Sequence, residues 1–149
     1  MKTFHVKPNM QIPQKKKNTS ETGQLGEKIA KMFLVKRGFS RFEANFRQKC
    51  GEIDIVAHET STGTLWFFEV KTLSVGSFPC AEWGNELGSG GFRPEEQVDR
   101  RKLAKLYRTI TIYLDQKGVS QETPWRLGVI SVLLNSETRL ARVSFIPVL

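Results

Sequence analysis

Residues 65–71, with the sequence LWFFEVK, constrain the fold more than any other part of this chain. The first four residues are apolar, and the segment ends with Glu69 and Lys71 two positions apart. In a strand these two side chains lie on one face, because successive side chains alternate between the faces. A buried charge is unfavourable unless it is paired or binds a metal ion. The segment therefore predicts a core strand whose end carries either a salt bridge or a functional site.

The remaining hydrophobic patterns predict two helices and four further strands. Apolar residues at helical spacing predict a first helix that starts near Ser20 and ends at Gly38, and a second that starts at Pro94 and ends at Gly118. The glycine-rich stretch 74–93 is expected to form a long loop. The predicted class is α/β, in the order α-β-β-β-α-β-β, with the first three strands in an antiparallel meander. The predicted strands are residues 39–46, 52–58, 64–71, 125–135 and 140–148.

Composition and charge predict one folded domain behind a basic arm. The 149 residues are 39% hydrophobic, which is enough for the core of one ordinary domain. Residues 1–20 hold five lysines, two prolines and no acid, so we expect a flexible arm there and a single domain in residues 21–149. From residue 21 onward, 18 basic and 15 acidic side chains leave only +3 of the net charge of +8. Most of the excess charge therefore belongs to the arm.

The two cysteines and the absence of long apolar runs predict a cytoplasmic protein. Cys50 and Cys80 have neither the spacing of a metal site nor that of a secreted disulfide framework, so reduced thiols are expected. The sequence has no run of about 18 apolar residues and no apolar N-terminal leader. We therefore expect no membrane partner.

Asp54 is the second charge that interrupts an apolar strand, in the segment Ile53-Asp54-Ile55-Val56. Carboxylates from adjacent strands, here Asp54 and Glu69, can converge on one cation, and oxygen ligands of this kind suit magnesium, with manganese as a substitute. Such a cation would stabilise the charge that develops on a phosphate, and the ammonium of Lys71 would position water or neutralise the phosphate. The alternative is a structural ion-pair cluster at the edge of a sheet.

Two motifs carry a resemblance to a known family. The sequence GEIDIV at residues 51–56, followed about a dozen residues later by FEVKT at 68–72, closely resembles the YraN-like family of small bacterial proteins. These are predicted endonucleases of the PD-(D/E)XK superfamily. The segments 26–30 and 97–102 also match, and the resemblance covers about residues 23–135.

The resemblance implies a restriction-endonuclease-like mixed sheet of about five strands flanked by helices. Asp54 and Glu69 would be metal ligands, and Lys71 would be the catalytic lysine. Glu27 on the first helix matches a carboxylate that archaeal Holliday-junction resolvases of the superfamily use as an accessory ligand. The alternative for Glu27 is an ordinary pair with Lys31 one helical turn away.

Further residues are weaker candidates for the site or for DNA contact. Glu52 shares a side of its strand with Asp54, so it is a further candidate ligand or supporting residue. Gln97 is a candidate for orienting a site carboxylate. The basic residues of the second helix either contact phosphates or form the solvated side of that helix. The DNA-contact candidates are Lys102, Arg101 and Lys105.

The sequence departs from the family pattern at two places. Gly128 stands where family members generally carry an aspartate, and the 74–93 loop is longer than is usual in the family. Both departures bear on substrate recognition rather than on Asp54, Glu69 and Lys71, which are intact.

The predicted function is a metal-dependent endonuclease that hydrolyses DNA phosphodiester bonds. By superfamily analogy, the favoured substrate is branched or single-stranded DNA. Members of the superfamily often dimerise so that two active sites act on the two DNA strands. The sequence is compatible with a homodimer. Two other functions also stay open: a non-catalytic nucleic-acid-binding module with the nuclease fold, and an interaction factor in DNA uptake or repair.

Overall fold

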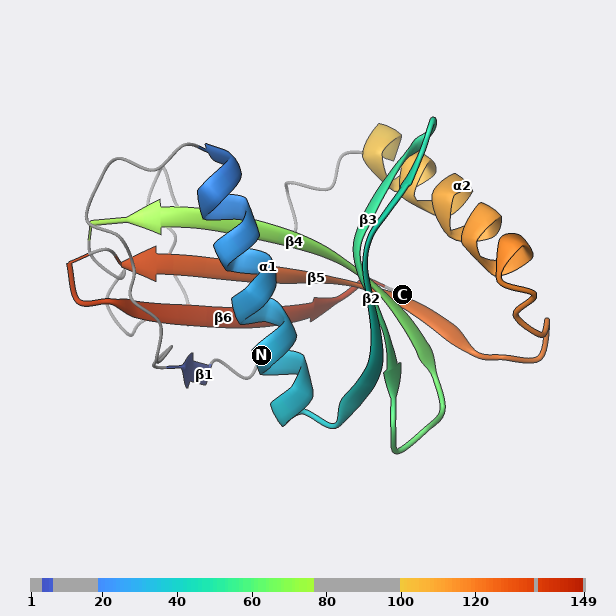
Figure 1. Ribbon diagram of the computed structural model, residues 1–149, viewed down its shortest axis with the longest axis horizontal. Helices are drawn as coiled ribbons and strands as arrows, with labels where there is room; N and C mark the ends of the chain where they lie inside the picture. Colours follow the sequence, from blue (N-terminus) through green and yellow to red (C-terminus); the bar gives the residue numbers. More distant parts are fainter. Residues whose placement is uncertain (1–3, 7–18, 77–99, 136, 149) are drawn as a thin grey trace.

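One mixed sheet with a helix on each face forms the framework of the computed structural model, which describes residues 4–6, 19–76, 100–135 and 137–148 (Figure 1). In chain order the elements are β1 (Phe4–Val6), α1 (Thr19–Lys36), β2 (Phe39–Gln48), β3 (Gly51–Glu59), β4 (Leu65–Val75), α2 (Arg100–Gln116), β5 (Trp125–Asn135) and β6 (Leu140–Pro147). The strand order is β1-β6-β5-β4-β3-β2, with β4 and β5 parallel and the other neighbouring pairs antiparallel.

The five long strands and two helices confirm the predicted fold class and element order. Strand β1 was not predicted: it falls within the segment expected to be an arm, and it pairs with β6. Residues 1–3 and 7–18 of that arm, most of the predicted glycine-rich loop and the expected helix start at Pro94 lie outside the described residues. Thr19 and Ser20, predicted in the arm, belong to α1, and Ser74 and Val75, predicted in the loop, belong to β4. Helices α1 and α2 end just before the glycines that were predicted to stop them. Gly38 and Gly118 have φ angles of +83° and +59°, which favour glycine after the end of a helix.

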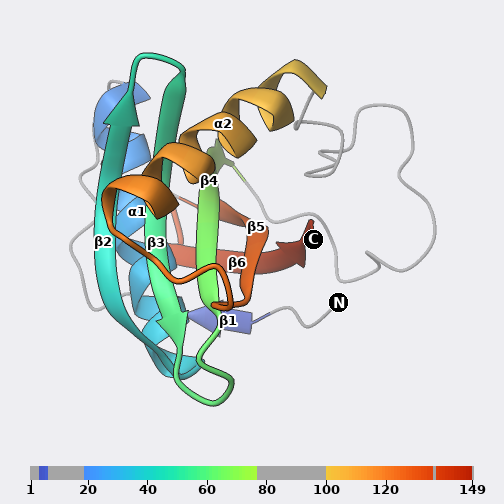
Figure 2. The same cartoon turned by 90° about the vertical axis from the view of Figure 1, so that its right-hand side faces the viewer.

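Strand β4 is covered on both faces, as its apolar run requires. Trp66 and Phe68 belong to the core beneath α1, whereas Leu65 and Phe67 belong to the core beneath α2. The two helices lie on opposite sides of the sheet in the two cartoon views (Figures 1 and 2). This two-sided burial is why charges at the end of β4 cannot simply face bulk water.

Strands β3 and β4 pair over only a short distance. Their register runs from His58 opposite Leu65 to Ile55 opposite Phe68, so the described pairing stops just before Asp54 and Glu69. The β2–β3 hairpin then rises away from the line of β4 (Figure 1). The two strands therefore form a fork, with Asp54 on one arm and Glu69 on the other.

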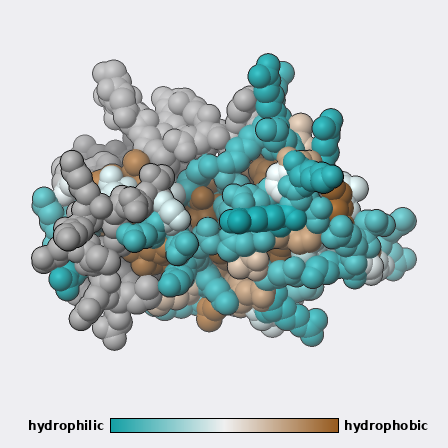
Figure 3. All heavy atoms as spheres, turned by 45° about the horizontal axis from the view of Figure 1, so that its top comes forward, coloured by the Kyte–Doolittle hydropathy of each residue, from teal (hydrophilic) through white to brown (hydrophobic). Residues whose placement is uncertain are grey.

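The described residues on the face drawn in Figure 3 are largely hydrophilic, with small hydrophobic areas between polar side chains. No described helix is long and apolar enough to cross a membrane.

Candidate active site

Asp54 lies where β3 leaves β4, and its side chain takes the place of the missing strand pairing. Its Oδ2 atom accepts a hydrogen bond of 2.6 Å from the backbone N–H of Val70 on β4. The residue is only 8% exposed. The fork thus fixes a buried carboxylate beside β4, and the role of Asp54 as a metal ligand stays a prediction.

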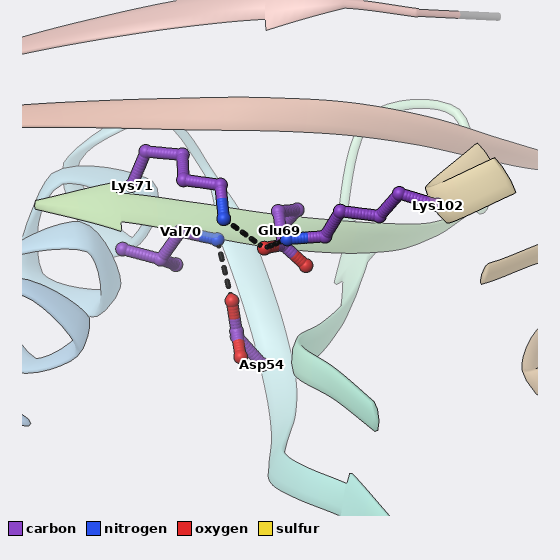
Figure 4. A network of polar contacts seen from close by, with 5 residues as sticks. All are labelled: Asp54, Glu69, Val70, Lys71 and Lys102. Atoms are coloured by element: carbon purple, nitrogen blue, oxygen red, sulfur yellow. Dashed lines mark hydrogen bonds and ion pairs between the residues drawn. The ribbon is translucent and has the colours of Figure 1, made fainter. Parts of the chain in front are cut away.

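Glu69 lies on β4 and binds two lysines through one oxygen atom (Figure 4). The Nζ atom of Lys71 is 2.8 Å from Glu69 Oε1, and the Nζ atom of Lys102 contacts the same oxygen. Glu69 and Lys71 share a face of β4, as the alternation of strand side chains requires. Lys102 reaches them from α2, so the structure places it at the carboxylates rather than on a separate surface.

The surroundings of Asp54 disfavour the ionised form of its carboxyl group. Burial raises the pKa of Asp54 to about 7, and the negative charges of Glu69, Glu27 and Glu52 add to the increase, whereas the Val70 N–H acts in the opposite direction. A salt-bridged carboxylate has the reverse behaviour, since a nearby cation lowers its pKa. The site therefore gains from an additional positive charge near Asp54.

Lys71 is stabilised in its charged form. Burial by itself lowers the pKa of the Lys71 ammonium, but the hydrogen bond and negative charge of Glu69, with the charge of Asp54, raise it above the ordinary value. An ammonium is thus maintained beside both carboxylates, as the predicted role of Lys71 requires.

Glu27 approaches from α1 because that helix packs unusually closely on β4. A Cβ atom at Gly26 would lie 1.7 Å from Thr72 Oγ1, so only glycine allows this contact. Glu27 Oε2 accepts a hydrogen bond of 3.2 Å from Asn45 Nδ2, while the predicted alternative partner Lys31 lies over the Phe42 ring. Glu27 therefore lies close enough to act on Asp54, although its described hydrogen-bond partner is an amide.

A groove of about 550 Å³ runs between α1 and β2 beside Glu27. It lies where β2 is irregular, with a register shift between Ser40 and Glu43 and a φ of 55° at Asn45. An asparagine tolerates this left-handed conformation better than most residues. Basic side chains also line the groove, namely Lys28, Lys31 and Arg47. The role of Asn45 could not be predicted from the sequence, because its backbone conformation depends on the irregular pairing of β2.

The remaining predicted residues do not join this group of carboxylates and lysines. Glu52 is exposed and pairs with Arg47 at 3.0 Å, so it acts on Asp54 only through its charge. Arg101 and Lys105 are exposed on α2. Gln97 lies outside the described residues. The structure thus brings Asp54, Glu69, Lys71 and Lys102 together, with Glu27 at their side.

Gly128 on β5 does not line this site. A Cβ atom there would lie 2.6 Å from Phe145 Cε2 and 3.3 Å from the ring of Phe68. The partner of Glu69 on β5 is Val129 rather than Gly128. An aspartate at position 128 would therefore meet aromatic rings, and the glycine is explained by packing.

The donor chemistry fits a magnesium ion with few protein ligands. The described residues contain no group of three or more His, Cys, Asp or Glu that could hold a metal ion. Magnesium commonly uses one or two carboxylates and takes its other ligands from water and phosphate. Asp54 and Glu69 would supply such a pair, and a cation there would relieve the unfavourable charge on Asp54. Glu27 stays outside this pair.

Fold and site together define an α/β protein with two buried carboxylates and two lysines at a fork in its sheet. The model of the uncharacterised protein family UPF0102 matches residues 26–132, a range that includes all these side chains. A UPF0102 protein of Clostridium botulinum strain 657 is 34% identical over 116 residues, which are 78% of this chain and 82% of that protein. A UPF0102 protein of Caldanaerobacter subterraneus is 34% identical over 123 residues, 83% of this chain and 88% of that protein. The chain belongs to the UPF0102 family.

Proposed function

We propose that this protein is a magnesium-dependent endonuclease of the PD-(D/E)XK superfamily that hydrolyses phosphodiester bonds in DNA. The observation that carries the proposal is the fork between β3 and β4, where Asp54 and Glu69 are buried beside the ammonium of Lys71. The motif resemblance supplies the reaction class, since the UPF0102 name itself assigns none.

The unfavourable charge on Asp54 supports a functional site over a structural ion-pair cluster. In an ion pair that only stabilises the fold, the partner lowers the pKa of the carboxyl. The pKa of Asp54 is raised instead, although two lysines lie at the neighbouring Glu69. Strained electrostatics of this kind is typical of catalytic and binding sites.

Each residue has a distinct role in the proposed reaction. Asp54 and Glu69 would hold the magnesium ion, which would supply Lewis-acid stabilisation of charge on the scissile phosphate. Lys71 would hold its ammonium next to the attacked phosphate, where it orients the water nucleophile and offsets the negative charge that grows during attack. The Val70 N–H fixes the Asp54 carboxylate, and the covered faces of β4 limit access of bulk water.

The substrate is expected to be DNA in a form that gives a strand access to the fork. The groove between α1 and β2 borders Glu27, and Lys28 and Lys31 give it positive side chains for phosphate contacts. Asp54, Glu69, Lys71 and Lys102 do not line this groove, so it would hold DNA beside the fork. By analogy with the superfamily, we propose a preference for branched or single-stranded DNA.

Variants of three residues separate the proposed roles. Asp54→Asn and Glu69→Gln each remove a charged ligand, so calorimetry should show weaker magnesium binding, and cleavage should fall with it. Lys71→Ala leaves both carboxylates and removes a nearby positive charge, so magnesium should bind as well as before or slightly better. Its cleavage rate should still fall by about 10² to 10³-fold, as for loss of one electrostatic stabiliser.

The competing function is a nucleic-acid-binding module that keeps the nuclease fold without catalysis. It predicts that all three variants bind DNA as the wild type does and that the wild type cleaves nothing. Arg108→Gln is a matched charge control, because Arg108 is exposed on α2. Cleavage by Lys71→Ala at the rate of this control would remove Lys71 from the mechanism.

A further inference from the structure

The unusual feature of Glu69 is that both lysines contact the same oxygen atom. Lys71 and Lys102 each place Nζ against Oε1, as the two dashed lines that end at Glu69 in Figure 4 show. A single ammonium would be enough to pair with one carboxylate. The second ammonium is therefore not needed to pair with the charge of Glu69 alone.

The two lysines differ in how firmly the fold holds them. Lys71 lies on β4 only two residues from Glu69, and its side chain is 26% exposed. Lys102 reaches in from α2, and its side chain is 36% exposed. Lys102 can turn outward by changing its own side-chain torsions, because its stem extends from a helix at the edge of the site. Lys71 is the less exposed of the two and lies on the same strand as Glu69.

Two ammonium groups lie at Glu69, whereas the described hydrogen bond of Asp54 comes from the backbone N–H of Val70. Asp54 and Glu69 carry two negative charges when ionised, and Lys71 and Lys102 carry two positive charges. A divalent cation bound by the two carboxylates would replace both ammonium charges, so the retained lysines would become surplus. The surplus charge is then free to bind an anion such as the phosphate of a nucleic acid.

We propose that Lys102 occupies the metal position on Glu69 until a divalent cation binds, and that it then moves to a phosphate group of the substrate. This inference rests on the proposed function and assigns its order of binding. The metal and Lys102 compete for one carboxylate oxygen, whereas the metal and the phosphate bind together. Metal binding thus increases the affinity for nucleic acid through Lys102.

Lys102→Gln tests the competition, with Lys105→Gln as the matched control from the next turn of α2. Calcium is the probe, because it binds oxygen ligands and allows binding to be measured by calorimetry without turnover. Lys102→Gln is expected to bind calcium about tenfold more tightly than the wild type, because a competing ammonium is gone. Lys105→Gln should stay within about twofold of the wild type, because Lys105 is exposed.

Two further readouts test the movement of Lys102. Reductive methylation followed by peptide mass spectrometry should show Lys102 modified faster with calcium than without it. Calcium should raise the affinity of the wild type for single-stranded DNA by more than it raises that of Lys102→Gln. The effect of Lys105→Gln on DNA affinity should be the same with and without calcium.

The outcomes distinguish this inference from the proposed function. If calcium binding requires Asp54 but is not strengthened in Lys102→Gln, and the modification rate of Lys102 does not change, the inference is wrong and the metal site remains. If neither the wild type nor Lys102→Gln binds calcium or magnesium, the proposed function and the inference both fail. If binding appears only in Lys102→Gln, the competition is supported directly.

Discussion

Replacement of Asp54 by asparagine should stabilise the metal-free protein at alkaline pH. The side chain is 8% exposed, and the pKa of its carboxyl rises from 3.8 to about 7, first through burial and then through the charge of Glu69. An amide has similar shape, carries no charge and can still accept the hydrogen bond from Val70. The variant therefore removes the unfavourable charge while it keeps the local contact.

The size of the effect follows from the pKa difference. A tenfold change in proton affinity corresponds to about 1.4 kcal/mol, so the interval from 3.8 to about 7 corresponds to about 4 kcal/mol. Because the folded-state pKa of Asp54 is the higher one, its contribution to stability is complete below pH 3.8 and is lost as the pH rises through about 7. Asparagine does not titrate, so the advantage of the variant grows across this range.

Urea unfolding in EDTA at several pH values measures this advantage. Asp54→Asn should match the wild type to within about 1 kcal/mol at pH 4 and exceed it by up to about 4 kcal/mol at pH 8. Magnesium at pH 8 should stabilise the wild type and have little effect on the variant. A variant that is less stable than the wild type at pH 8, or an advantage equal at both pH values, would refute the reasoning.

Three glycine substitutions test how closely α1 and β5 are packed. Gly26→Ala should lower the free energy of unfolding by about 1–3 kcal/mol, because the new Cβ atom would collide with Thr72, whereas Gly23→Ala on the same helix meets open space and should raise it by up to about 1 kcal/mol. Gly128→Ala should cost about 1–3 kcal/mol through contact with Phe145, and it should leave calcium affinity unchanged because position 128 does not face Glu69. Urea unfolding and calcium calorimetry check both sets, and equal stabilities of the two α1 variants would contradict the close packing of that helix on β4.

The elements of the fold could be predicted because local patterns and burial agree. The apolar run before Glu69 required a strand covered on both faces, and the structure places β4 between the two helices. The short strand β1 could not be predicted, because three residues carry too little pattern and their pairing depends on the exposed edge of β6. Edge pairing of this kind is decided by tertiary structure.

The candidate site could be predicted in part for a similar reason. Charged residues inside apolar strands identified Asp54, Glu69 and Lys71 without knowledge of the fold. Lys102 lies 33 residues from Glu69, and only the packing of α2 against the sheet brings it to that oxygen atom. The contact between Asn45 and Glu27 also depends on an irregular strand, which alternation patterns do not reveal.

Cleavage of a panel of DNA substrates is the most direct test of the central claim. The wild type and Lys71→Ala would be incubated with labelled duplex, single-stranded, flap and four-way-junction DNA in magnesium, manganese or EDTA. We expect the wild type to cleave at least one of these substrates with a divalent metal and none in EDTA, with a rate about 10² to 10³-fold higher than that of Lys71→Ala. No cleavage by the wild type with either metal, or equal cleavage by Lys71→Ala, would contradict the assignment of this protein as a nuclease that uses Asp54, Glu69 and Lys71.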